Sequence, residues 1–409
     1  MDLTHPSNPT RILLDTTRRC QLTCWYCHSS SGPDYRGPTL ETDTIPELFD
    51  AAEQLRTFDV TITGGEPTLW AGLIAALENS HRFTFTSLQL ITNALAPSRR
   101  ILRAIESANL SRICVSLDGI GDVHETNRGP GTYTRTLRGI RDLMTVTDNI
   151  TVISVIDATN HQRWPELTRT LAELGVSQHH LAPVCFAGHA MTDYRGLTTQ
   201  QFAEVAEDAE SLSAHLPNGF ILRFNDTLVR APRSRTMSLH QMTETWKGWH
   251  VIVRPDGDVR TAVRAWGRSW RADETHGNLH RAPFATIARP QGATPTPFSR
   301  PEELARKFHL NATDPQILAD IADVAVQDRH HEHTLGAVHS APSPDIAVAP
   351  DLGIDLTELR NRLRADPSLY RFRSEAGFAL LFNTRSHDVH ILDHTETATL
   401  ATELAGDLR

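Results

Sequence analysis

The feature that most constrains the fold of this chain is an alternation of short apolar segments with segments of helical periodicity. The apolar segments are rich in β-branched residues and predict six strands, at residues 12–16, 60–63, 88–92, 113–117, 150–156 and 180–184. Helical periodicity is found near residues 45–57, 70–80, 97–109, 133–146, 162–174 and 198–213. This alternation is typical of βα units around a parallel sheet, so we expect an α/β fold.

Polar motifs follow the first four predicted strands. The first strand leads into a cysteine-rich loop and the third into Asn93, while Ser116 and Asp118 end the fourth. The second strand is followed by a glycine-rich turn, Gly64-Gly65-Glu66-Pro67. In a parallel αβ barrel the chemistry lies at the carboxyl ends of the strands, so these motifs predict one site.

The cysteine-rich loop predicts a metal centre. Three of the five cysteines, Cys20, Cys24 and Cys27, form a CxxxCxxC motif within eight residues. Three thiolates on one short loop suit a metal better than disulfides. A cubane cluster held by three thiolates keeps one iron open for substrate or cofactor. Zinc with His28 as fourth ligand is the alternative, although structural zinc loops more often use paired CxxC motifs.

With Tyr26 as the aromatic residue before the last cysteine, the loop resembles that of the radical S-adenosylmethionine (radical SAM) enzymes. The turn at residues 64–67 is similar to their GGEP motif. Residues 116–129 are similar to the SLDG…H…RG segment of the subfamily that modifies peptides. The resemblance implies a partial (β/α)6 TIM barrel, with residues 8–230 as its core. It also implies a 5′-deoxyadenosyl radical that abstracts a hydrogen atom.

The resemblance also assigns roles to individual residues. It implies one [4Fe–4S] cluster on Cys20, Cys24 and Cys27, with SAM bound to the open iron. The cofactor contacts that it implies are Gly64, Gly65, Glu66, Pro67, Asn93, Ser116, Asp118 and Arg128. In this scheme the glycine-rich turn meets the ammonium group of SAM, Ser116 and Asp118 meet the ribose, and Arg128 pairs with the carboxylate.

Two cysteines lie outside the motif. Cys114 is inside the fourth predicted strand, where a lone cysteine usually behaves as a small buried hydrophobe. Cys185 follows the sixth strand and could face the barrel mouth. It is the candidate catalytic residue, since a thiol there could donate a hydrogen atom to a substrate radical, as in radical SAM epimerases. Simple packing is the reading that the usual burial of free cysteine favours.

After the barrel, residues 246–259 predict a hairpin with a Pro-Asp-Gly turn, and Gly277-Asn278-Leu279 follows. Residues 231–290 resemble a SPASM or twitch extension. No cysteine occurs after Cys185, so this extension is degenerate and holds no thiolate-ligated auxiliary cluster.

Residues 291–352 read as Pro- and Ala-rich linkers around a helical segment. Four histidines at 330, 331, 333 and 339 could chelate a metal or be solvated. Residues 353–409 resemble the first half of a peptide-recognition (RRE) winged helix, with a hairpin at 370–392 and a helix at 395–404. We expect an exposed edge and an apolar face there, fit for a leader peptide that adds as a strand.

Composition limits the partners. The net charge of −9 offers no general attraction to nucleic acid or to anionic membranes, and no apolar run is long enough to cross a bilayer. The N-terminus lacks a secretory signal, which predicts a cytoplasmic protein. We expect a precursor peptide as substrate, or a small molecule such as a sugar or nucleoside, and a flavodoxin- or ferredoxin-type electron donor. A catalytically silent scaffold is the remaining alternative, against which the complete cysteine motif argues.

Overall fold

The computed structural model describes residues 8–95, 97–224, 227–228, 236–238, 250–261, 275–288, 313–314, 356–375 and 378–403. Its main sheet contains seven consecutive parallel strands, each paired with the next along the chain. They are β1 (Arg11–Asp15), β2 (Asp59–Thr63), β3 (Ser87–Thr92), β4 (Leu110–Ser116), β5 (Ile150–Ile156), β6 (Gln178–Pro183) and β7 (Ile221–Phe224). All six predicted strands are confirmed, and β7 is a further parallel strand.

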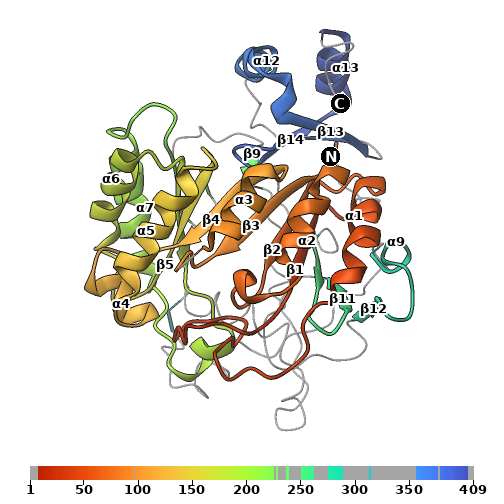
Figure 1. Cartoon of the computed structure of the whole chain (residues 1–409). Coiled ribbons are helices and arrows are strands. Elements are labelled where there is room, and N and C mark those ends of the chain that lie inside the picture. Colours follow the sequence, from red (N-terminus) through yellow and green to blue (C-terminus); the bar gives the residue numbers. More distant parts are fainter. Residues whose placement is uncertain are drawn as a thin grey trace.

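The helices cover the outside of this sheet (Figure 1). They are α1 (Ile45–Gln54), α2 (Leu73–Glu78), α3 (Arg99–Ser107), α4 (Asp122–Arg128), α5 (Thr132–Met144), α6 (Trp164–Leu174) and α7 (Thr199–Ser213). The short helix α4 was not expected, because only the longer segment at 133–146 shows helical periodicity. Among the helices that the structure describes, none has both the length and the apolarity needed to cross a membrane.

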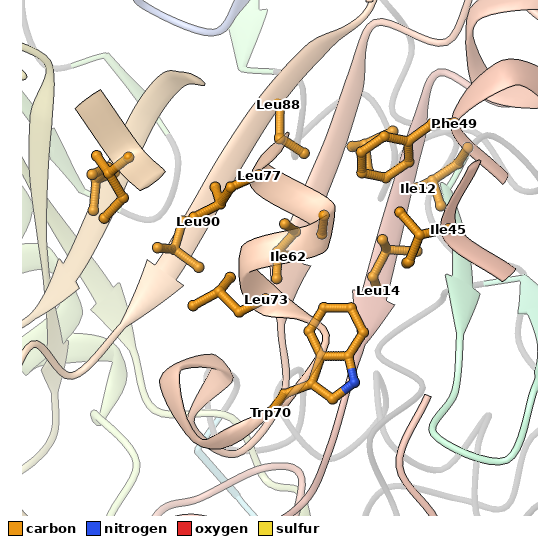
Figure 2. Close-up of a cluster of buried hydrophobic side chains, with 14 of the residues drawn as sticks. Ile12, Leu14, Ile45, Phe49, Ile62, Trp70, Leu73, Leu77, Leu88 and Leu90 are labelled. Carbon is orange, nitrogen blue, oxygen red and sulfur yellow. The ribbon is translucent and has the colours of Figure 1, made fainter. Parts of the chain in front are cut away.

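The core lies between strands and helices because each contributes one apolar face. Figure 2 shows side chains of β1, β2 and β3 facing those of α1 and α2. The residues labelled there are all buried: Ile12, Leu14, Ile45, Phe49, Ile62, Trp70, Leu73, Leu77, Leu88 and Leu90. This packing holds the strands in register, and so holds the loops at their carboxyl ends in place.

The predicted hairpin after the barrel is present and extends the main sheet. Strand β10 (His250–Val253) pairs in parallel with β1, and β11 (Asp258–Thr261) returns antiparallel to it. Strand β12 (Thr275–Asn278) follows on β11, and α9 (Phe284–Ile287) packs beside α1. At the other end of the sheet the short strand β8 (Thr227–Leu228) pairs with β7. The hairpin after the barrel is therefore a direct continuation of the barrel sheet.

A second sheet is built mainly from the C-terminal residues. Its strands are β13 (Tyr370–Glu375), β14 (Phe378–Asn383) and β15 (Asp388–Leu392), flanked by α12 (Leu356–Ala365) and α13 (His394–Glu403). The predicted hairpin and helix are thus present, with a third strand. The second linker and its four histidines lie outside the described residues.

The expectation of an open apolar face at this hairpin is wrong, whereas the expected edge is present, because β13 lies at one edge of the sheet. Strand β14 is an inner strand, and β15 pairs on its far side with β9 (Thr236–Ser238) of the same chain. Both faces of β14 are also covered. Ala379 and Leu381 pack with Leu359 and Leu363 of α12, while Leu380 and Phe382 are buried on the opposite side.

The face that carries Phe382 is packed against the barrel. Phe382 stacks on Phe58, which precedes β2, with ring centroids 5.2 Å apart. Arg373 donates one hydrogen bond to the carbonyl oxygen of Pro9, just before β1, at 3.1 Å. Arg223 of β7 forms a buried ion pair with Asp388 at 2.7 Å. The C-terminal sheet therefore closes the end of the barrel opposite the cysteine loop, as Figure 1 shows.

Candidate active site

The cysteine loop leaves the carboxyl end of β1 and closes on itself. The amide of Cys20 donates to the carbonyl oxygen of Gly32 at 3.1 Å. The amide of Gly32 in turn donates to the carbonyl oxygen of Arg18 at 3.1 Å. The amide of Cys27 donates to the carbonyl oxygen of Cys24 at 3.1 Å. All three cysteines are free thiols, with Cys20 and Cys24 buried and Cys27 half-buried.

The surroundings of these thiols suit a metal centre. Burial raises the pKa of Cys20 to about 12 and that of Cys24 to about 11. Such thiols become thiolates only when a cation replaces the proton, as a bound metal does. Backbone amides already point at two of the sulfurs, from Leu22 to Cys20 at 3.4 Å and from Ser31 to Cys27 at 3.3 Å.

The exposed side chain of His28 follows the loop's last cysteine. The described residues hold no group of three or more thiol, imidazole or carboxylate side chains gathered about one point. This holds for Cys20, Cys24 and Cys27 as well, whose thiols share one loop but do not meet about one point as the ligands of a single metal ion would.

The glycine-rich turn after β2 is pressed against the start of the cysteine loop. The amide of Gly65 donates to the carbonyl oxygen of Thr17 at 2.5 Å. The amide of Glu66 donates to the carbonyl oxygen of Arg19 at 2.9 Å. Gly64 has a φ of +138°, and a Cβ atom there would lie 2.5 Å from the oxygen of Thr17. Side chains do not fit at this approach, so the two glycines are required by backbone contact with the cysteine loop.

The side chain of Glu66 points into the protein and joins the ends of β2 and β3. One carboxylate oxygen accepts from the amide of Thr68 at 3.0 Å and the hydroxyl of Thr92 at 2.7 Å. The other accepts from the amide of Asn93 at 2.8 Å. Burial raises the pKa of Glu66, while these hydrogen bonds act in the opposite direction. Glu66 thus positions the surrounding backbone, and the buried Pro67 begins a short 3-10 turn behind it.

Asn93 connects the end of β3 to the cysteine loop. Its side-chain amide donates to the sulfur of Cys20 at 3.9 Å, and its side-chain oxygen accepts from Gln21 at 3.2 Å. The prediction that β3 ends at the site is consistent with this contact.

Asp118 and Arg128 are paired with each other. The guanidinium donates from Nε to one carboxylate oxygen at 2.9 Å and from Nη2 to the other at 3.2 Å. The hydroxyl of Tyr26 in the cysteine loop also donates to Asp118, and the amide of Val155 does so at 3.1 Å. Burial acts to raise the pKa of Asp118, but Arg128, His124 and the hydrogen bond from Tyr26 together outweigh it, so the pKa lies below its ordinary value.

The sequence did not predict this pairing, because Arg128 lies ten positions after Asp118 in a segment without an expected helix. Helix α4 carries Arg128 back over the end of β4, where Ser116 is half-buried. The same helix holds Asn127, whose side-chain oxygen accepts from the indole of Trp25 at 2.9 Å. Helix α4 thus fixes two adjacent aromatic residues of the cysteine loop.

The end of β6 also reaches the cysteine loop, as predicted. Val184 and Ala190 pack in one buried cluster with Cys20, Cys24 and Tyr26. Cys185 is half-buried beside them in the chain, with its sulfur 4.0 Å from the carbonyl oxygen of Pro183. By contrast, Cys114 is buried within β4, with its sulfur 3.7 Å from the side-chain oxygen of Gln89 on β3. The structure therefore gathers the predicted site residues at one end of the barrel and keeps Cys114 apart.

Comparison with known proteins gives a consistent assignment. The family model of the radical SAM superfamily matches residues 14–171. The chain is 24% identical over 219 residues to PqqA peptide cyclase of Gluconobacter oxydans (strain 621H), which covers 53% of this chain and 61% of that protein. The chain thus spans less than two thirds of the length of this relative.

Two solved structures share the fold. SuiB of Streptococcus suis, bound to precursor peptide SuiA, has a TM-score of 0.55 at 12% identity, covering 70% of this chain and 66% of SuiB. The protein anSMEcpe with bound AdoMet has a TM-score of 0.51 at 13% identity, covering 68% of this chain and 80% of that chain. The chain therefore contains a radical SAM domain, the domain shared by the enzymes of that superfamily, matched over residues 14–171.

Proposed function

We propose that this chain is a radical SAM enzyme that binds one [4Fe–4S] cluster through Cys20, Cys24 and Cys27 and modifies a ribosomally made peptide. The observation that carries the proposal is the contact between the glycine-rich turn and the cysteine loop. It puts the backbone expected to meet SAM against Thr17 and Arg19, which lead directly into Cys20, the first of the thiols expected to hold the cluster. When both are bound, the cluster and SAM supply the reductive cleavage that begins hydrogen-atom abstraction.

The chain's own residues bind and orient these groups. The backbone at Gly64, Gly65 and Pro67, held in place by the buried Glu66 and by Asn93, would bind the methionine end of SAM. The bonds from Arg128 to Asp118 use Nε and Nη2, so Nη1 is the donor that we assign to the SAM carboxylate. Ser116, at the end of β4, is assigned to the ribose.

A peptide is the substrate that best agrees with the relatives. One relative is named a peptide cyclase and one neighbouring structure holds a precursor peptide. With no cysteine after Cys185, auxiliary clusters held by thiolates play no part in binding that peptide. We assign the reducing electron to a flavodoxin- or ferredoxin-type donor. We assign Cys185 the role of a hydrogen-atom donor to the substrate radical.

Anaerobic reconstitution followed by iron analysis tests the cofactor assignment. We expect about four irons per chain, because three thiolates on one loop hold one cubane. With reductant and SAM, the preparation should release 5′-deoxyadenosine. The triple variant Cys20→Ala/Cys24→Ala/Cys27→Ala should do neither, whereas the control Cys114→Ala should do both. About eight irons per chain, or a cluster that survives the triple substitution, contradicts the proposal.

Mass spectrometry tests the substrate class. A short peptide encoded beside this chain should change mass when incubated with the reconstituted protein, reductant and SAM, and not with the Cys20→Ala variant. Cys185→Ser should leave the release of 5′-deoxyadenosine intact and stop or alter the peptide modification. Modification of a sugar or nucleoside with no change in the peptide refutes the peptide assignment.

A further inference from the structure

The loop between β6 and α7 contacts the cysteine loop along residues 185–195, which we call the 185–195 loop. Its residues Gly188–Thr192 form a 3-10 helix, η4, directly after Cys185 and Phe186. Ala190 of this helix is fully buried in the same cluster as Cys20 and Cys24. Apart from Cys185, no residue of this loop belongs to a sequence motif described above.

Gly188 is required by the closeness of this contact. Its φ is +59°, in the left-handed region that favours glycine. A Cβ atom at this position would overlap the backbone carbonyl oxygens of Cys27 and His28. These are backbone atoms of the cysteine loop itself, so no side-chain rotation could relieve the overlap.

His189 makes two hydrogen bonds to the backbone of the cysteine loop. Its amide donates to the carbonyl oxygen of Cys27 at 2.9 Å. Its side-chain Nδ1 lies 3.2 Å from the carbonyl oxygen of Cys24, and since a carbonyl oxygen only accepts, Nδ1 carries the proton. Both acceptors belong to cysteines of the CxxxCxxC motif.

A third contact lies further along the same loop. The guanidinium of Arg195 stands 4.8 Å from the ring centroid of Trp25, the residue after Cys24. The indole N–H of Trp25 also donates to the side-chain oxygen of Asn127 on α4 at 2.9 Å. The segment from Cys24 to Cys27 is therefore held between α4 and the 185–195 loop.

We propose that Gly188 and His189 are positioning residues for the cluster-binding loop. They fix the backbone of Cys24 and Cys27 and join it to the strand end that carries Cys185. Cluster ligands and the predicted hydrogen-atom donor thus share one rigid connection, which keeps the thiols in place and shields them from solvent. This role rests on the proposed function where it concerns the cluster.

Thiol alkylation of the metal-free chain tests the positioning role without any cofactor. Iodoacetamide labelling with peptide mapping gives separate rates for Cys24 and Cys27, with the buried Cys114 as internal reference. His189→Ala should raise the rates at Cys24 and Cys27 about fivefold, the factor that corresponds to one lost hydrogen bond. Gly188→Ala should raise the labelling rates of Cys24 and Cys27 further, because the added methyl group displaces the 185–195 loop from the cysteine loop.

Two further variants separate positioning from general damage. His189→Asn keeps a side-chain N–H at a similar distance from the backbone and should restore the slow labelling. His215→Ala removes an exposed histidine whose Nδ1 lies 3.0 Å from the carbonyl oxygen of Ser211, far along α7, and should change nothing. Unchanged labelling in His189→Ala, or an equal rise at Cys114, overturns the proposal.

The reconstituted protein provides the second measurement. Loss of iron to a chelator should be about fivefold faster in His189→Ala than in the wild type or in His215→Ala. If the wild-type chain takes up no cluster, the proposed function fails while the alkylation result still decides the positioning role. If the cluster forms and leaves His189→Ala and the wild type at the same rate, the positioning role is refuted and the function stands.

Discussion

Replacing Phe382 by alanine tests whether the C-terminal sheet is part of the barrel's folding unit. Phe382 is fully buried, stacked on Phe58 at 5.2 Å and in edge contact with His387 at 5.2 Å. Truncation of a buried phenylalanine costs about 3–5 kcal/mol, of which the aromatic pair accounts for about 0.5–1.5 kcal/mol. Since whole domains are stable by about 5–15 kcal/mol, the loss should be obvious.

Tryptophan fluorescence during urea unfolding is the suitable assay. The chain has no tryptophan after Trp270, whereas Trp70 and Trp164 are buried in the barrel. The signal therefore reports unfolding outside the C-terminal sheet. Phe382→Ala should shift the fluorescence transition to lower urea, and Phe58→Ala combined with it should show a coupling energy of about 1 kcal/mol.

The control is Phe372→Ala, a half-buried phenylalanine that packs beside the helical side of the C-terminal sheet. It should lower the stability clearly less than Phe382→Ala. If the fluorescence transition of Phe382→Ala coincides with that of the wild type, the C-terminal sheet unfolds separately. The inference that the C-terminal sheet and the barrel form one folding unit would then be wrong.

Three other substitutions probe the site and its support. Glu66 accepts hydrogen bonds from two N–H groups and one O–H group, and Glu66→Gln replaces one of its acceptor oxygens by an NH₂ donor. This substitution should lower the free energy of unfolding by about 1–3 kcal/mol. It should also weaken SAM binding in calorimetry, whereas the exposed Glu47→Gln should change neither. Arg128→Met leaves Asp118 buried and unpaired and should cost about 3–5 kcal/mol in thermal unfolding. Adding Asp118→Asn should recover part of that loss, and a further loss in the double variant would refute the buried pair. His179 is buried between the hydroxyls of Ser154 and Thr168, and burial lowers its pKa from 6.5 to about 3. Below pH 6.5 the unfolded chain binds a proton that the folded chain does not, so stability should fall by about 1.4 kcal/mol per pH unit from this group. His179→Gln should flatten that slope in urea unfolding at pH 7, 6 and 5, and an unchanged slope contradicts the lowered pKa.

The local features of the site were readable without a structure. The strands of the barrel have apolar runs that only a buried sheet accommodates, and the motifs follow them directly in sequence. Parallel strands present all their carboxyl ends at one edge, so Cys20, Gly64, Asn93 and Asp118 had to meet. The alternation of strands and helices was therefore enough to predict both the fold and the end of the barrel that carries the site.

Contacts between distant segments were decided only by the tertiary structure. The directions of side chains in loops do not follow from periodicity, which is why the sequence did not predict the ion pair between Arg128 and Asp118. In the hairpin at 370–392, successive side chains point to opposite faces of the sheet, as in any pair of strands. This alternation does not indicate what covers each face. Packing against Phe58 and pairing with β9 settled this, because burial of those apolar and backbone groups is gained only once the barrel has formed. For the same reason His189 has no signature in the sequence: its role depends on two carbonyl oxygens some 160 residues earlier in the chain.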